Sequence, residues 1–247
     1  MDNLAMKKHL ALIVATLCIA IPATHVEAQQ KATKDIATIS EYGPAERIHN
    51  LDDLKKELKQ YQACTCKCGC YSRDINHQAA VAIDFLRTRA AHRRPGEKLA
   101  LVLDIDETTL SNYDQMLQAD FAYNAAASDG WIESAKAPAI PGTFRIFQDA
   151  KRLGVSVFFL TGRPEAQRPA TVLNLHNQGF SDWQELIMRP PAQASATALV
   201  FKSAARGTIE REGFKIVLNV GDQWSDLKGE PQAEFSVKYP DPYYFIQ

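Results

Sequence analysis

The sequence predicts an α/β fold: a Rossmann-like parallel sheet with helices on both of its faces. Short apolar runs alternate along the chain with longer amphipathic segments, an order that is typical of parallel sheets. The strand-like runs begin at Leu99, Val155, Leu186 and Phe214, and a last one covers residues 235–238. Two of these runs stop at aspartates, and open α/β sheets bind ligands at the carboxyl ends of their strands.

The N-terminus has the features of a secretory signal peptide, which we expect to cover residues 1–28. Two lysines precede an apolar run from Leu10 to Ile21, and Val26-Glu27-Ala28 offers small residues for cleavage. The apolar run is too short to span a membrane. We therefore expect the protein in a bacterial periplasm or secreted from the cell, with no stable membrane anchor.

Length and charge restrict the classes of partner. The 247 residues suit one α/β domain with an insert. The formal net charge of −1 gives no reason to expect a nucleic acid polymer as a partner. An oligomer is compatible with the sequence.

Residues 29–71 are predicted to form an N-terminal helical extension that ends in a cysteine cluster. Apolar residues recur at helical spacing from Leu51 to Tyr61, and Asn50 is expected to cap this helix. The extension precedes a main domain over residues 72–247.

The cysteine cluster consists of Cys64, Cys66, Cys68 and Cys70. Alternate residues of an extended strand have α-carbons about 6.5 Å apart, which is near the upper limit for a disulfide. A bent loop is therefore needed, and Gly69 can provide it. Two local disulfides are the first interpretation for an exported chain. A zinc or copper thiolate site is the alternative, although structural zinc sites usually space paired cysteines more widely.

The main domain begins with a helix that Ser72 is expected to cap. Its apolar stripe runs from Ile75 to Leu86. Pro141 suits the start of the next helix and Gly154 its end. Further helices are expected over residues 165–177 and 201–211.

Residues 110–140 lack a clear hydrophobic period. They are rich in alanine and in aromatic residues such as Tyr113, Phe121, Tyr123 and Trp131. The sequence therefore predicts a small insert directly after the first strand. Each aromatic residue is expected to serve local packing before it serves a substrate.

Four stretches carry the candidate chemistry, and three of them are motifs that follow strands. The motifs are Asp-Ile-Asp-Glu-Thr at 104–108, Phe-Leu-Thr-Gly-Arg-Pro-Glu at 159–165 and Gly-Asp-Gln-Trp-Ser-Asp-Leu at 221–227, and the fourth stretch is Lys202. Carboxylates as close as Asp104 and Asp106 repel each other and are costly to bury, so a divalent cation would stabilise them. On that stretch alone, solvated turn acids with Thr108 as a helix cap explain the pattern equally well.

Taken together, the four stretches resemble the haloacid dehalogenase-like phosphotransferases. The likeness is greatest to their secreted acid phosphatase branch, the class B/C and plant vegetative-storage-protein-like group. It extends from about Ile75 to the C-terminus. It implies a Rossmann-like sheet with a small cap inserted after the first catalytic strand, here approximately residues 110–140.

The resemblance also implies a role for each acidic residue. Asp104 would attack phosphorus and form an aspartyl-phosphate, and Asp106 would act as general acid and then as general base. The cofactor would be Mg²⁺, which prefers oxygen ligands. Its ligands would be Asp104, Asp222 and the backbone carbonyl of Asp106. Asp226 lies four residues after Asp222 and is either another ligand or a brace for the ligands.

The same resemblance implies a phosphate-binding set. Thr161 and Gly162 would hold phosphate oxygens, and Lys202 would neutralise their charge. Arg163 would reach either the substrate or an acidic neighbour. The expected function is a secreted, magnesium-dependent acid phosphatase that acts on small phosphomonoesters.

Two alternative functions stay open. One is a phosphotransferase of the same superfamily, in which an acceptor hydroxyl replaces water. The other is a binding or storage protein with little turnover on the same fold. The presence of both Asp104 and Asp106 argues against this second alternative.

Overall fold

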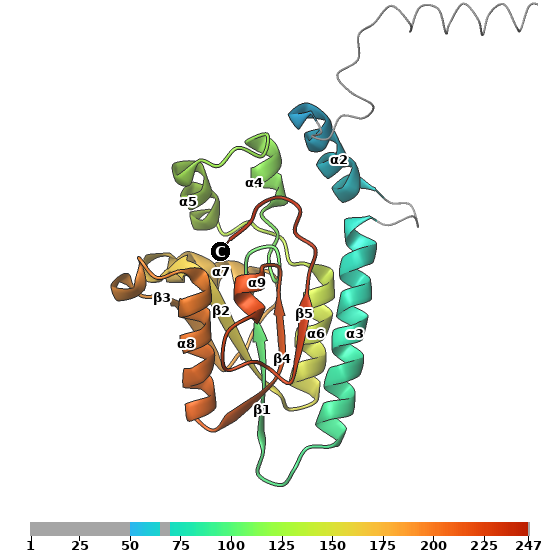
Figure 1. Ribbon diagram of the computed structural model, residues 1–247, viewed down its shortest axis with the longest axis vertical. Coiled ribbons are helices and arrows are strands. Elements are labelled where there is room, and N and C mark those ends of the chain that lie inside the picture. Colours follow the sequence, from blue (N-terminus) through green and yellow to red (C-terminus); the bar gives the residue numbers. More distant parts are fainter. Residues whose placement is uncertain (1–49, 65–69, 247) are drawn as a thin grey trace, which may run out of the picture. The chain divides into compact units, whose positions relative to one another are not determined.

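The computed structural model describes residues 50–64 and 70–246, which belong to one compact unit. Five strands form a sheet in the order β3-β2-β1-β4-β5, and every neighbouring pair is parallel (Figure 1). Their bounds are β1 (Lys98–Leu103), β2 (Ser156–Pro164), β3 (Glu185–Arg189), β4 (Phe214–Gly221) and β5 (Phe235–Lys238). The predicted α/β fold is confirmed. The predicted signal peptide lies outside the described residues.

The two faces of the sheet are covered by different helices. Leu99, Leu101 and Leu103 of β1 pack on one face in a core shared with α3 (Tyr71–Ala91) and α6 (Pro141–Arg152). Ala100 and Val102 face the other way, toward α8 (Ala198–Arg211). Because both faces of β1 are buried, its sequence is an unbroken apolar run.

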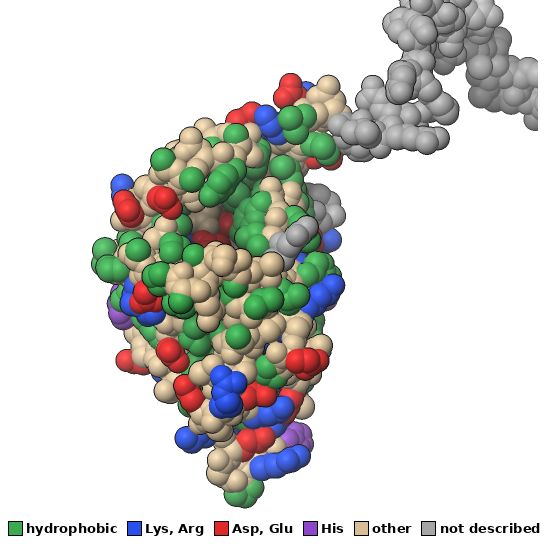
Figure 2. Space-filling model, turned by 60° about the vertical axis from the view of Figure 1, so that its left-hand side comes forward, with side chains coloured by type: hydrophobic (Ala, Val, Ile, Leu, Met, Phe, Trp, Pro, Cys, Tyr) green, Lys and Arg blue, Asp and Glu red, His purple; other side chains and the backbone are tan. Residues whose placement is uncertain are grey.

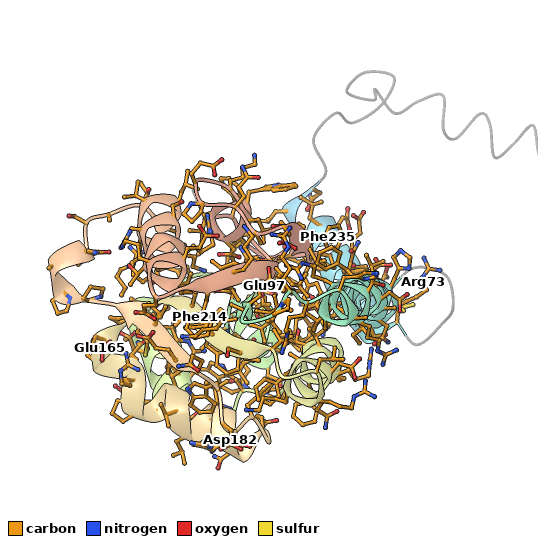
Figure 3. All side chains as sticks on the ribbon, turned by 90° about the horizontal axis from the view of Figure 1, so that it is seen from below. Arg73, Glu97, Glu165, Asp182, Phe214 and Phe235 are labelled. Atoms are coloured by element: carbon orange, nitrogen blue, oxygen red, sulfur yellow. The ribbon has the colours of Figure 1, made fainter. Side chains whose placement is uncertain are left out.

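The edge of each core is closed by aromatic pairs. Phe235 stacks on Phe85 of α3 at a centroid distance of 4.7 Å, and Phe214 meets Phe158 edge-on at 5.0 Å. Figure 3 labels Phe214 and Phe235, which extend the α8 core and the α3 core respectively.

The helix starts follow local capping. Asn50 caps α2 (Leu51–Ala63) by accepting a hydrogen bond from the amide of Asp52, as predicted. The prediction that Ser72 caps the next helix is wrong, because α3 begins one residue earlier, at Tyr71, with Cys70 at the N-cap. Cys70 and Tyr71 are both buried, and this packing sets the helix start in place of a hydroxyl cap.

Only part of the cysteine cluster belongs to the described residues. Cys64 follows α2, and the Cys70 thiol lies 3.9 Å from the hydroxyl of Ser72. Cys66 and Cys68 lie outside the described ranges, so the pairing of the cluster stays a prediction.

The insert between β1 and α6 contains two short helices, α4 (Tyr113–Gln118) and α5 (Ala125–Glu133). They lie beyond the carboxyl ends of the strands (Figure 1). A 3₁₀ turn over Glu165–Gln167 leads into α7 (Arg168–Asn177), which contacts α5. The described ranges contain no helix with the length and apolar character that a membrane crossing needs.

Candidate active site

The carboxyl edge of the sheet contains a cleft of about 250 Å³. Asp104 and Asp106 enter it from the end of β1, Gly162 from β2, and Asp222 from the end of β4. The short helix α9 (Trp224–Leu227) and α8 add further polar side chains. Figure 2 shows a hollow with acidic side chains at its floor and hydrophobic side chains around its rim.

Three carboxylates in this cleft lie close enough to share one cation. Asp104, Asp222 and Asp226 each offer an oxygen, these oxygens lie within 4.8 Å of one another, and all three residues are buried. Burial raises the pKa of Asp104 to about 7, although Lys202 opposes this rise. Burial, followed by the charge of Asp104, raises the pKa of Asp222 well above its usual value.

Lys202 is the cation that this cluster already has. Its Nζ lies 2.5 Å from Asp104 Oδ1 and also contacts Asp226 Oδ1, and the lysine is buried. One lysine leaves three carboxylates with excess negative charge. A hard divalent cation with oxygen ligands fits this donor set.

Other side chains hold the cluster in place. Thr108 donates to Asp222 Oδ1 at 2.9 Å, and the carboxylate of Asp226 accepts the amide of Gln223 at 2.8 Å in a capping box of α9. Asp226 thus supports the turn after Asp222 through Oδ2, while its Oδ1 contacts Lys202. The structure brings the four predicted residues Asp104, Asp222, Asp226 and Lys202 together.

Asp106 has different partners. Its Oδ1 accepts from Arg163 Nη2 at 2.7 Å and from Asn112 Nδ2 at 2.8 Å. Burial acts to raise the pKa of Asp106, but Arg163 and Asn112 outweigh it and hold the pKa below its usual value. Of the two roles left open for Arg163 in the sequence, the structure shows contact with an acidic neighbour.

The strand-end motif of β2 has a buried and an exposed part. Thr161 is fully buried, and its hydroxyl accepts the amide of Arg163 at 3.2 Å. Gly162 is exposed and lines the cleft. The backbone of Gly162 is therefore the part of this motif that a phosphate in the cleft would meet.

Several residues at the site received no role from the sequence, although Gln223 lies within the motif at 221–227. Gln223 donates to the carboxylates of Asp222 at 2.8 Å and Asp241 at 2.5 Å, and it accepts the amide of Ile246 at 3.1 Å. Tyr244 is held by a 3.1 Å hydrogen bond from its hydroxyl to Glu107. The C-terminal segment 241–246 thus forms one wall of the cleft.

Fold and site together define the class: an open α/β protein whose parallel sheet presents a carboxylate cluster, a lysine and an arginine to one cleft. Within this class, the chain belongs to the HAD superfamily, subfamily IIIB (acid phosphatase), whose family model matches residues 24–247. This confirms the acid phosphatase branch that the motifs predicted.

Proteins that are similar to this chain are consistent with this family assignment. Acid phosphatase 1 of Solanum lycopersicum is 42% identical over 148 residues, which cover 59% of this chain and 58% of that protein. A stem 31 kDa glycoprotein of Glycine max is 33% identical over 180 residues, with 71% of this chain and 68% of that protein covered. The class C acid phosphatase from Bacillus anthracis with tungstate bound has the same fold, with a TM-score of 0.64 at 20% identity over 78% of this chain and 86% of that one.

Proposed function

We propose that the protein is a magnesium-dependent acid phosphatase that hydrolyses small phosphomonoesters through an aspartyl-phosphate. One observation carries the proposal: the two carboxylates after β1 have different partners. Asp104 faces Lys202 and the acid cluster, whereas Asp106 faces Arg163 and Asn112. Two carboxylates in different environments suit two different roles. Family membership supports the reaction class.

In the first step, an oxygen of Asp104 attacks phosphorus, and the bond from phosphorus to the ester oxygen breaks. Asp106 transfers a proton to the departing oxygen. The backbone of Gly162 and the ammonium group of Lys202 would hold the phosphoryl oxygens, since both residues line the cleft. Water then attacks the phosphorus of the aspartyl-phosphate, Asp106 accepts its proton, and inorganic phosphate leaves.

Asp104, Asp222 and Asp226 would hold the Mg²⁺, with the backbone carbonyl of Asp106. When bound, the ion supplies positive charge that screens the nucleophile from the negatively charged phosphate of the substrate. Asp226 also contacts Lys202, so we propose two roles for it: it supports the site and it binds the ion. We also propose that the enzyme acts outside the cytoplasm, on the basis of the leader over residues 1–28.

Metal removal provides the direct test. We expect purified protein to release phosphate from an aryl phosphate with Mg²⁺, to lose this activity in a chelator, and to regain it when Mg²⁺ is returned in excess. Asp222→Asn removes one charged ligand, so it is expected to raise the Mg²⁺ concentration for half-maximal activity at least about tenfold. Asp84→Asn, an exposed change on α3, serves as the matched control. Full activity in the chelator would contradict the proposal.

The pH dependence follows from the lowered pKa of Asp106. The lowered pKa keeps Asp106 a carboxylate in the free enzyme around neutral pH, so the proton for the leaving group must arrive with the substrate monoanion. A phosphomonoester has its second pKa near 6. We therefore expect kcat/KM for an alkyl phosphate to fall about tenfold per pH unit above roughly pH 6.

Arg163→Gln is expected to change the acidic limb of the pH profile of kcat/KM. Without the guanidinium, the burial that raises the pKa of Asp106 is opposed by the weaker effects of Asn112 and Lys202, so the pKa rises. The acidic limb of kcat/KM is then expected to move to higher pH, which narrows the active range from the acid side. An acidic limb that coincides with that of the wild type would show that Arg163 does not set the ionisation of Asp106.

The phosphotransferase alternative is decided by an acceptor. With a primary alcohol such as glycerol in excess, a transferase forms a new phosphomonoester in preference to inorganic phosphate. The proposed hydrolase releases inorganic phosphate as its main product under the same conditions. Product analysis by phosphorus NMR separates the two outcomes.

A further inference from the structure

Asn112 connects the insert to the active site. Its Nδ2 donates to Asp106 Oδ1 at 2.8 Å and to Glu107 Oε2 at 3.0 Å. Its Oδ1 accepts from the indole Nε1 of Trp131, on α5, at 2.9 Å. An indole only donates and an ionised carboxylate only accepts, so these partners determine the orientation of the amide.

The backbone of Asn112 is fixed as well. Its amide donates to Glu107 Oε1 at 2.5 Å. Glu107 adopts a left-handed backbone with φ +54°, which directs the chain sharply away from β1. Both oxygens of the Glu107 carboxylate therefore bind Asn112, and the hydroxyl of Tyr244 adds a third contact. Asn112 is thus held from the turn, from α5 and, through Glu107, from the C-terminal segment.

These contacts divide the two oxygens of Asp106 unequally. Oδ1 receives Arg163 Nη2 at 2.7 Å, Arg163 Nε at 3.1 Å and Asn112 Nδ2 at 2.8 Å. Among the described residues, Oδ2 receives only Arg163 Nε, at 3.1 Å. A carboxylate oxygen has two lone-pair directions. Oδ1 is therefore fully engaged, and Oδ2 keeps capacity for a proton.

We propose that Asn112 is a positioning residue for Asp106, and that Trp131 couples the insert to the proton transfer by orienting Asn112. Together with Arg163, Asn112 fixes the rotation of the Asp106 carboxylate so that Oδ2 donates the proton to the ester oxygen. The inference rests on the proposed function of Asp106. It gives the insert a part in the chemical step in addition to any contact with the substrate.

The chemistry offers a readout that a purely structural role does not move. A poor leaving group such as an alkoxide needs the proton from Asp106, whereas 2,4-dinitrophenolate leaves without it. The value of kcat/KM reports on steps up to the first irreversible one, here the departure of the leaving group, so the later role of Asp106 as a base does not enter. Loss of positioning should therefore affect alkyl phosphates selectively.

The test compares kcat/KM for ethyl phosphate and for 2,4-dinitrophenyl phosphate. Trp131→Phe keeps the ring and removes the indole N–H, and Asn112→Ala removes the amide. Each is expected to lower kcat/KM for ethyl phosphate about 10- to 100-fold, within the range of general acid catalysis. The change for the dinitrophenyl ester should stay below about threefold. Trp183→Phe, the same substitution on a ring packed against Phe159, should leave both values unchanged.

A second comparison separates this inference from the proposed function. Asp106→Asn is expected to show the same selectivity to a greater degree. If Asp106→Asn is selective but Trp131→Phe and Asn112→Ala lower both substrates equally or neither, the positioning role is wrong and the general acid stands. If Asp106→Asn itself is not selective, both the general acid role of Asp106 and the positioning role of Asn112 are wrong. Thermal unfolding verifies that the variants fold, and Trp131→Phe suffices if Asn112→Ala does not.

Discussion

Asp104→Asn is expected to lower phosphate release from any phosphomonoester by on the order of 10⁴-fold or more, because an amide oxygen does not replace a carboxylate as the nucleophile. The substitution preserves shape, so substrate affinity should change much less than turnover. It also removes one of three clustered buried carboxylates, of which Lys202 contacts Asp104 and Asp226. In the presence of a chelator we therefore expect the variant to be at least as stable to heat as the wild type.

The combination of these two effects makes the measurement specific. Steady-state kinetics with an aryl phosphate is paired with thermal unfolding in a chelator and in Mg²⁺. Exposed Asp84→Asn, which removes the same charge from the surface of α3, should change neither activity nor stability. A folded Asp104→Asn protein that retains a tenth of wild-type turnover would exclude Asp104 as the nucleophile. A wild-type protein that binds Mg²⁺ but turns over no phosphomonoester would favour the storage or binding alternative.

The sequence predicted the sheet because its strands are unusually easy to recognise. β1 is buried on both faces, so its five residues from Leu99 to Leu103 are all apolar and end abruptly at Asp104. The same abrupt change from apolar to polar residues occurs after Val220, before Asp222. A parallel sheet brings such strand ends to one edge, so the two aspartates were expected to meet.

The insert was predicted because residues 110–140 lack a hydrophobic period. Neither α4 nor α5 contains a buried residue. A helix without a buried face needs no hydrophobic stripe, so the stretch 110–140 shows no helical period. Two of its aromatic residues, Tyr113 and Phe121, pack against each other and against Tyr243 from the C-terminal segment. The sequence could therefore predict an insert but not its helices.

The supporting residues of the site could not be predicted, because their roles depend on how the chain folds back on itself. Tyr244 lies 137 positions after Glu107, and Gln223 binds a C-terminal segment without regular structure. Asn112, in contrast, lies close to Asp106 in the sequence. Its contact with Trp131 nevertheless requires the insert to be folded. Strand-end motifs identify the groups that are proposed to react, whereas the residues that orient them depend on tertiary contacts.

Arg206 is another supporting residue whose role could not be predicted from the sequence. Its replacement is expected to have the second large effect, on stability. Arg206 lies one turn after Lys202 on α8, with its side chain on the same face, and it is fully buried. Its guanidinium binds the backbone carbonyls of Asp226 at 2.6 Å, Lys228 at 2.5 Å, Gly229 at 3.0 Å and Pro231 at 2.9 Å. These carbonyls belong to α9 and to the segment that follows it, so Arg206 anchors the backbone that carries Asp226.

Arg206→Met is therefore expected to destabilise the fold by about 3–5 kcal/mol, because it leaves the buried carbonyl of Asp226 and three part-buried carbonyls without their donor. For a chain of this size, the melting temperature should fall by roughly 6–20 °C. Arg206→Lys keeps the charge but not the planar fork, so its loss should be intermediate. Arg211→Met, at the exposed end of the same helix, is the control and should stay within about 0.5 kcal/mol of the wild type.

The effect of Arg206 on function should follow its effect on structure. Well below its melting temperature, Arg206→Met is expected to need more Mg²⁺ for half-maximal activity, since Asp226 loses the support of its backbone carbonyl, while kcat at saturating Mg²⁺ changes little. Denaturant unfolding and Mg²⁺ titrations measure the two effects separately. Two results would show that this buried arginine does not anchor the turn that is proposed to bind the metal. One is an Arg206→Met protein that unfolds at the same denaturant concentration as the wild type. The other is a less stable Arg206→Met protein that keeps the wild-type Mg²⁺ requirement.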